Sequence, residues 1–134
     1  MNNRETKSKV MALGNRLSKT MDRREAFIQA WVIVKAGAVT FPVRGVMAEN
    51  RQEALKRLNA YAPAQIRTFL LPELENKFDN QAIAIMVGVN GGKGYYKLGY
   101  IPASETGKVI ALRGKASIRV LPGDIHGARL TLAV

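Results

Sequence analysis

Apolar residues recur at helical spacing near the start of the chain. Intervals of three and four place them on one face and predict an amphipathic helix over residues 3–20, with the stripe Val10, Leu13, Leu17 and Met21. Cations occupy much of the remaining surface of this helix. Gly14 lies within it and lowers its intrinsic stability, since glycine is a poor helix former.

A second helix is expected directly after the first. Asp22 is a suitable N-cap, with Glu25 three residues on, and Gly37 is suited to end the helix. The apolar face of this helix consists of Phe27, Ala30, Trp31 and Val34. Trp31 could stack on a base, but a tryptophan within such a stripe is more often a core anchor, so we expect it to be buried.

From Ala38 onward the pattern becomes that of short strands separated by turn residues. We expect strands over residues 39–47, 66–71, 82–89, 95–101, 117–121 and 128–134. Two helices interrupt them, one that Asn50 caps and that runs to about residue 60, and one from Pro102 to about residue 112. The sequence therefore predicts an α+β chain, mainly β with helices. A basic helical segment, residues 1–37, precedes a small SH3- or OB-like β-barrel with two inserted helices, residues 38–134.

Net charge is the unusual feature of the composition. The chain has 134 residues of ordinary globular hydrophobicity (47%), but its 21 Lys and Arg residues oppose only 10 Asp and Glu residues, a formal net charge of +11. A surplus of this size favours a polyanionic partner, and nucleic acid is the partner we expect. An anionic membrane surface and an acidic protein are alternatives that the charge alone leaves open.

The absence of cysteine limits both chemistry and location. It excludes disulfides, thiolate chemistry and cysteine-based zinc sites, and it suits a reducing cytoplasm. The longest apolar run, residues 82–89, is too short to span a membrane. The apolar stretch 26–43 follows two arginines as a late signal segment would, but Gln29 and Lys35 interrupt it. We therefore expect a cytoplasmic protein that does not associate with membranes.

Residue types suited to catalysis are scarce. The single histidine, His126, has no nucleophile and orienting group at a recognisable spacing. Glu73, Glu75 and Asp79 could bind a cation, but their spacing lacks the pattern and the glycine of an EF-hand. The glycines at positions 91, 92 and 94 are not followed by the Lys-Ser/Thr helix start of a phosphate loop. We expect a protein without enzymatic activity, bound metal or cofactor.

Flat side chains are the second requirement for binding nucleic acid, beside cations. The candidates are Phe78, Tyr95, Tyr96 and Tyr100. Phe78 stands apart from the others because it lies in a polar loop, where no periodic pattern assigns it to the core. It either stacks on a base or folds back to fill the core, and the sequence does not decide between the two.

Four stretches of the chain carry a family resemblance. They are, in order, residues 43–46 (VRGV) followed by 51–55 (RQEAL), residues 72–85 (PELENKFDNQAIAI), residues 98–102 (LGYIP) and residues 127–130 (GARL). Their order and spacing resemble those of the HIRAN domain, a small β-barrel found at the N-terminus of some SWI/SNF-class ATPases and as free-standing bacterial and phage proteins. The resemblance covers residues 43–134, about two thirds of the chain, and implies the barrel fold.

The resemblance also implies a binding site. HIRAN domains bind single-stranded DNA at a free 3′ end, where bases stack on two aromatics and a neighbouring aspartate helps to hold the terminal hydroxyl. Phe78 falls on one of these aromatics, Asp79 on the aspartate and Asn76 on the polar residue before them. The second aromatic position falls near Met47 and Ala48, so that wall of the site does not carry over.

Three further residues, Arg51, Lys97 and Tyr100, are candidates to replace the missing wall. We therefore expect a non-catalytic DNA-binding module for single-stranded DNA or free 3′ ends. The leading alternative belongs to a different class, a phage or mobile-element adaptor that binds a host protein. A nuclease accessory domain with a carboxylate metal site is a third reading, which Mg²⁺-dependent cleavage would reveal.

Overall fold

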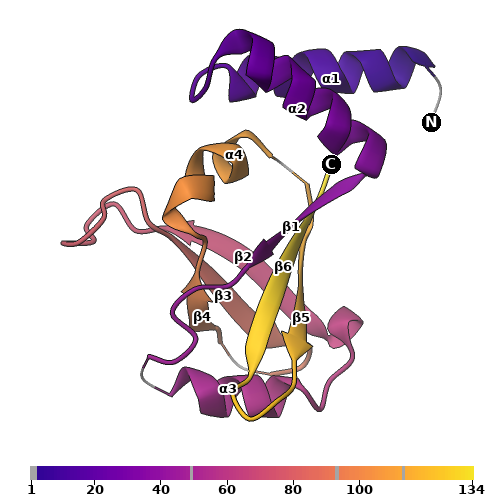
Figure 1. Cartoon of the computed structure of the whole chain (residues 1–134). Coiled ribbons are helices and arrows are strands. Elements are labelled where there is room, and N and C mark those ends of the chain that lie inside the picture. The colour runs from indigo at the N-terminus through magenta and orange to yellow at the C-terminus, as the bar shows by residue number, and fades with distance from the viewer. Residues whose placement is uncertain (1–2, 49, 93, 113) are drawn as a thin grey trace. The chain divides into compact units, whose positions relative to one another are not determined.

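The computed structural model describes residues 3–48, 50–92, 94–112 and 114–134. The described residues are about 38% helix and 29% strand, which confirms the α+β class but with more helix than the mainly β composition that the sequence predicted. Contacts divide the chain into two compact units (Figure 1). The first contains residues 1–39, 107–115 and 132–134, and the second contains residues 40–106 and 116–131.

The first unit is built on two helices that pack against each other, α1 (Asn3–Leu17) and α2 (Arg23–Ala36). The predicted stripe of α1 is buried at Val10, Leu13 and Leu17. Gly14 is buried as well, and a Cβ atom at this position would lie 2.6 Å from the Phe27 ring. The glycine therefore lets the ring lie against the α1 backbone, which explains a poor helix former in the middle of this helix.

Both caps of α2 are as predicted. The Asp22 side chain accepts a hydrogen bond from the Glu25 amide at 3.3 Å, and Gly37 has a left-handed φ of 83°. The buried face, however, consists of Ala26, Ala30, Ile33 and Val34.

The prediction that Trp31 is a core anchor is wrong, because 40% of its surface is exposed. Ala26, Ala30, Ile33 and Val34 form the buried side of α2, and Trp31 lies outside it. The Lys35 ammonium lies 5.4 Å from the Trp31 ring centre.

A basic side chain of α1 has a structural role in the same unit. The Arg16 Nε atom donates a hydrogen bond to the carbonyl oxygen of Ala111 at 2.6 Å, at the end of α4 (Thr106–Ala111). Helix C-termini leave carbonyl groups without partners inside the helix, and a cation is well suited to pair with them. Arg16 is therefore committed to holding the unit together rather than to a ligand.

The strands form two sheets. The first has the order β1 (Ala38–Pro42), β6 (Gly127–Ala133), β5 (Ala116–Leu121), and the second has the order β2 (Ile66–Pro72), β3 (Ile83–Val89), β4 (Tyr96–Tyr100). Each predicted strand is present, although the first ends at Pro42 and Arg44 makes only an isolated bridge to Tyr100. In the part of the chain that the structure describes, the hydrogen bonds leave these as two separate sheets and no closed barrel is detected.

The core of the second unit gathers around β3, whose near-continuous apolar run is buried as predicted. Strand β2 contacts β5, and β4 contacts the helix α3 (Arg51–Leu58). The largest fully buried side chains of this unit are Leu55, Leu58, Ile85, Val87, Leu98, Ile118 and Leu130. Short 3-10 helices at Pro63–Gln65 and Ala103–Glu105 connect these elements to their neighbours.

The start of α3 differs from the prediction. Asn50 makes no side-chain cap, because its backbone (φ −95°, ψ 22°) lacks the extended conformation from which a capping side chain reaches back. Arg51, the first residue of α3, instead connects the start of this helix to the segment before it. It is buried, and its Nη1 atom donates to the carbonyl oxygen of Gly45 at 2.7 Å.

No helix in the described ranges is long and apolar enough to cross a membrane.

Candidate nucleic-acid-binding site

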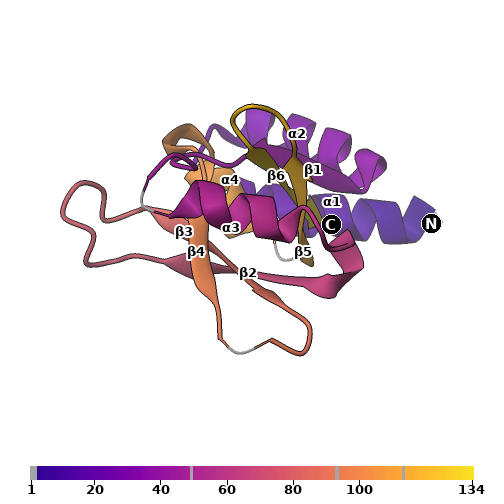
Figure 2. The same cartoon turned by 90° about the horizontal axis from the view of Figure 1, so that it is seen from below.

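The loop between β2 and β3 projects away from the strands (Figures 1 and 2). Its backbone is fixed by two of its own side chains. The Asn76 Oδ1 atom accepts hydrogen bonds from the amides of Phe78 (2.9 Å) and Asp79 (3.0 Å), and the Asp79 Oδ1 atom accepts one from the amide of Gln81 (2.9 Å). Asn and Asp favour such local turns because their short side chains reach the backbone two or three residues on. The loop is therefore a defined turn at Asn76–Asp79.

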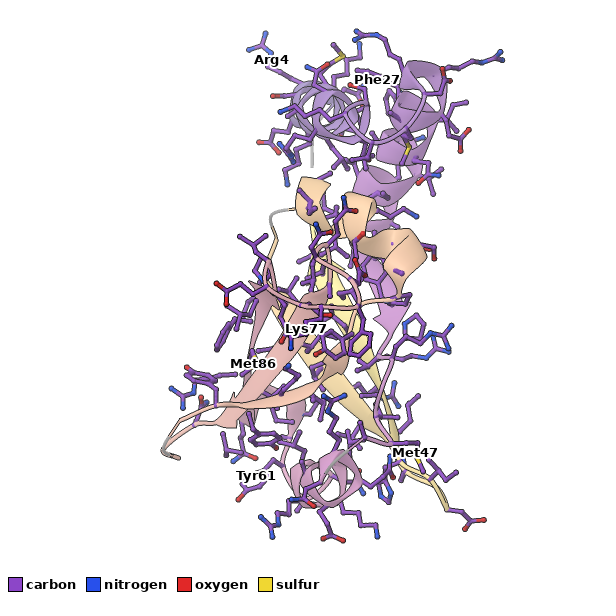
Figure 3. All side chains as sticks on the ribbon, turned by 90° about the vertical axis from the view of Figure 1, so that its left-hand side faces the viewer. Arg4, Phe27, Met47, Tyr61, Lys77 and Met86 are labelled. Carbon is purple, nitrogen blue, oxygen red and sulfur yellow. The ribbon has the colours of Figure 1, made fainter. Side chains whose placement is uncertain are left out.

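Phe78 is carried on this turn with 99% of its surface exposed. The alternative in which Phe78 folds back into the core is therefore wrong. An apolar ring held fully in water has no stabilising role in the fold, whereas both of its faces are open to a flat ligand. Lys77, labelled in Figure 3, precedes it on the loop and adds a positive charge.

Glu73 connects the loop to β4. Its Oε1 atom accepts hydrogen bonds from Asn76 Nδ2 (3.1 Å) and from the Tyr100 hydroxyl (2.8 Å), and its Oε2 atom forms an ion pair with Lys97. The hydrogen bond from Lys97 is the largest influence that lowers the pKa of Glu73, and the same bond raises the pKa of Lys97. Both groups therefore stay charged across the neutral range.

A bulge in β4 makes this arrangement possible. Lys97 and Tyr100 are three positions apart, and in a regular strand such residues point to opposite faces. The pairing of β3 with β4 shifts register between Ile85 and Met86, which pair with Gly99 and Lys97. The shift brings the Lys97 Nζ atom to 2.9 Å from the Tyr100 hydroxyl.

The Tyr100 ring lies beside two cations. The Lys97 ammonium is 5.0 Å and the Arg51 guanidinium carbon 5.4 Å from its centre. The Arg51 Nε atom is buried and has no hydrogen-bond partner among the described residues. The structure thus connects all six predicted site residues through one chain of contacts, from Arg51 through Tyr100, Lys97 and the unpredicted Glu73 to the turn at Asn76–Asp79.

A pocket of about 530 Å³ lies where α3 faces β4. It is lined by Asn50, Arg51, Glu53, Ala54, Arg57, Tyr96 and Lys97, so three cations oppose one carboxylate. The sequence analysis named Tyr96 only as one of four candidate stacking aromatics and did not name Arg57. Arg57 follows Glu53 and Ala54 at helical spacing, so the three residues lie on one face of α3. The sequence shows this face, but not that it lies beside β4. Burial raises the pKa of the Tyr96 hydroxyl, which therefore stays neutral.

The other candidate chemistry finds less support. In the described part of the chain, no three His, Asp or Glu side chains converge as metal ligands, and Glu73 is engaged by Lys97. His126 is held through its backbone, since its amide donates to Gln52 Oε1 (2.8 Å) and its carbonyl accepts from Gln52 Nε2 (2.8 Å). This clamp gives His126 a role in fixing the β5–β6 turn to α3.

Comparison with known proteins adds little. No family model matches the chain, and no curated protein is significantly similar to it. Among solved structures, a protein from Lactobacillus plantarum determined by a structural genomics consortium is 18% identical over 72% of this chain and 97% of its own, with a TM-score of 0.42. A likeness at this level carries no argument about fold or function. The resemblance of residues 43–134 to the HIRAN domain therefore stays a prediction.

Proposed function

We propose that this chain is a non-catalytic module that binds single-stranded DNA or free 3′ ends. The observation that carries the proposal is Phe78, a fully exposed ring on a turn that Asn76 and Asp79 hold in one conformation. A rigid aromatic contributes to binding without a large loss of conformational entropy, and every base offers it a flat face. The lack of cysteine suits a cytoplasmic location, which completes the proposal.

Cations near the loop supply the second requirement. Arg51, Arg57 and Lys97 line the pocket beside α3, and Lys97 belongs to the hydrogen-bonded cluster that extends to the loop. Arg51 is buried and adds positive charge to the pocket wall, whereas the guanidinium that is exposed to a ligand there is that of Arg57. A phosphate oxygen is a suitable acceptor for a guanidinium in such a pocket.

Asp79 supports a preference for a free 3′ hydroxyl. Its carboxylate accepts a hydrogen bond from the Gln81 amide and pairs with no cation in the described residues. A carboxylate beside the stacking ring repels a terminal phosphate but can accept a hydrogen bond from a hydroxyl. A terminal nucleotide stacked on Phe78 would therefore be favoured when its 3′ end is unmodified.

The proposal is tested by fluorescence anisotropy with single-stranded, duplex, 3′-overhang and 3′-phosphate DNA at two salt concentrations. Phe78→Ala should weaken binding of every single-stranded form by about tenfold, as expected for the loss of one stacked base. Leu74→Ala is the matched control, since Leu74 is a 78% exposed apolar residue of the same loop. Equal affinities for the two variants would remove the basis of the proposal.

End recognition has its own test. Asp79→Asn removes the charge but keeps an oxygen that can accept from the Gln81 amide, so the turn is preserved. It should narrow the affinity gap between hydroxyl and phosphate ends, whereas Glu75→Gln in the same loop should leave the gap unchanged. If the parent protein binds both ends equally well, Asp79 has no part in end recognition.

The first unit, which contains the helices α1 and α2 and is called the helical unit below, favours a second candidate function, that of an adaptor for a host protein. Ile28, Trp31 and Val32 of α2 are 50%, 40% and 64% exposed, which is unusual for three large apolar residues on one helix. An adaptor that binds a host protein would use such a surface. The adaptor function would be supported over DNA binding if the chain binds a host protein tightly, if this binding persists at high salt, and if Trp31→Ala abolishes it.

A further inference from the structure

Strand β2 carries exposed rings outside the site described above. Along its length, Arg67, Phe69 and Leu71 alternate with less exposed residues, so their side chains lie on the outer face of the sheet. Phe69 is 39% exposed, and Tyr95, which precedes β4, is 44% exposed. Met86, labelled in Figure 3, is the register partner of Phe69 on β3.

These side chains form an ordered stack. The Phe69 and Tyr95 rings meet edge to face, with their centres 4.7 Å apart and their planes at 79°. The Arg67 guanidinium carbon lies 4.9 Å from the Tyr95 ring centre, and its Nη2 atom donates to the carbonyl oxygen of Val89 at 3.1 Å. The arginine is thereby held in place over the ring, rather than free to move in solvent.

Gly88 makes room for this stack. It pairs with Arg67 across the strands, and a Cβ atom at Gly88 would lie 3.0 Å from Tyr95 Cδ1 and 2.8 Å from the Gly94 carbonyl oxygen. The Tyr95 ring therefore lies against the bare backbone of β3, which a side chain at position 88 would prevent.

We infer that Arg67, Phe69 and Tyr95 form a second stacking platform, which binds internal bases of a single-stranded nucleic acid. A base is flat and is followed by a phosphate, so it needs a ring and a cation side by side. The platform offers both, and among the described residues no carboxylate pairs with Arg67 to neutralise its charge. A phosphate of the strand would supply the counter-charge that the Arg67 guanidinium lacks among the described residues.

This inference rests on the proposed function and extends it. The Phe78 loop would take the end of the strand, and the platform would take bases further along the strand. The two sites use different elements. Phe78 lies in the loop between β2 and β3, whereas Arg67 and Phe69 lie on β2 and Tyr95 directly precedes β4. Variants at the platform should therefore affect long strands and leave short ones bound at the loop.

The experiment compares the affinities of oligonucleotides of about 6 and about 15 nucleotides. Small single-strand-binding domains contact roughly 4–16 nucleotides, so the shorter strand can fill one site and the longer one both. Phe69→Ala and Tyr95→Ala should each weaken binding of the longer strand about tenfold and that of the shorter one less than about twofold. Tyr61→Ala, at a 42% exposed aromatic beyond α3, is the control and should change neither. Tyr95→Phe should retain parental affinity, because it keeps the ring.

A direct readout does not depend on any variant folding. A 5-iodouracil placed within the longer strand should crosslink, on irradiation, to the peptide that contains Phe69 or Tyr95. Crosslinks confined to the Phe78 loop, or platform variants that bind the longer strand like Tyr61→Ala, would overturn the platform while leaving the proposed function intact. A parent protein that binds no oligonucleotide would overturn both. If the parent protein dimerises, and Tyr95→Ala abolishes dimerisation without changing DNA binding, the surface binds a second copy of the chain and the platform is overturned.

Discussion

Glu73→Ala tests the cluster that joins the loop to β4. The substitution removes the acceptor for Asn76 Nδ2 and for the Tyr100 hydroxyl, and it removes the partner of Lys97. The turn that carries Phe78 then loses its side-chain link to β4, which runs through Glu73. We expect both the free energy of unfolding and the affinity for single-stranded DNA to fall, because the Phe78 ring is no longer held in one place.

The magnitude follows from the contacts. Each of the two hydrogen bonds from a neutral donor to the charged, partly exposed carboxylate contributes about 1 kcal/mol. The ion pair adds about 0.5–1 kcal/mol, since the side chains of Lys97 and Glu73 are 31% and 20% exposed and water screens them in part. The freed donors of Asn76 and Tyr100 regain some hydration. The expected loss of stability is therefore about 2 kcal/mol.

The assay is urea unfolding followed by far-UV circular dichroism, with Glu75→Ala as the control. Glu75 lies two positions further along the same loop and is exposed, so its removal should cost less than about 0.5 kcal/mol. Tryptophan fluorescence offers a second probe, because the one tryptophan, Trp31, belongs to the helical unit and should report an unchanged environment. Equal unfolding free energies for Glu73→Ala and Glu75→Ala would refute the role assigned to the cluster.

Acid provides an independent check on the same carboxylate. The folded pKa of Glu73 lies below its ordinary value of about 4.5, so its contribution to stability is present above that pH and is lost as the pH falls through the folded pKa. Glu73→Gln should therefore be less stable than the parent near neutral pH. The difference between the two proteins should shrink as the pH falls below about 4.5. A difference that does not change with pH would show that the charge of Glu73 is unimportant.

Two glycines give further predictions. Gly14→Ala should destabilise the protein by about 1–2 kcal/mol, because the new Cβ atom would lie 2.6 Å from the Phe27 ring and the gain in helix propensity offsets only part of that strain. Gly99→Ala should cost about 3 kcal/mol, since the Cβ atom would overlap the rigid carbonyl group of Arg44. Gly123→Ala, whose nearest neighbour would be at an ordinary 3.5 Å, is the control for both in thermal unfolding, and a loss equal to theirs would contradict the steric argument.

The elements could be predicted from the sequence more readily than the faces of the helices. The N-cap Asp22 and the C-cap Gly37 act locally, so the sequence was enough to place α2. Which side of α2 is buried depends on its neighbours, and the Gly14 gap on α1 that receives the Phe27 ring is a tertiary feature. The prediction for Trp31 failed because hydrophobicity alone ranks a tryptophan above two alanines.

The candidate site shows the same division. The turn at Asn76–Asp79 is built from side-chain to backbone bonds over two or three residues, which a sequence pattern can indicate. The meeting of Glu73, Lys97 and Tyr100 depends on a register shift in β4, and no pattern of period two predicts it. Glu73 therefore entered the sequence analysis only as one of three carboxylates in a doubtful cation site.

The distribution of charge yields the last prediction. The first unit, with residues 1–39, 107–115 and 132–134, contains eleven of the 21 Lys and Arg residues and three of the 10 acidic residues. It thus holds eight of the eleven net positive charges, although the candidate site lies in the second unit. If the proposed function is right, the helical unit supplies much of the attraction to phosphates and the second unit supplies the contacts to bases.

Neutralising exposed cations of α1 separates these contributions. Arg4, Lys7 and Lys9 are exposed, and glutamine preserves their helix propensity. The triple variant Arg4→Gln/Lys7→Gln/Lys9→Gln should lower affinity to a similar degree for all single-stranded sequences. It should also reduce the slope of log affinity against log salt by about 2, since each lost phosphate contact removes about 0.7.

Substitution is a better test than deleting the start of α1, because a deletion to Gly14 would also remove the buried Val10 and Leu13 and expose Phe27. Arg119→Gln/Arg129→Gln, at exposed positions of β5 and β6, is the control for net charge. An equal fall in salt slope per charge in both variants would mean that the attraction is spread over the whole surface. A larger fall for the α1 variant, with the preference for hydroxyl over phosphate ends unchanged, would locate phosphate binding on the helices and end recognition on the loop.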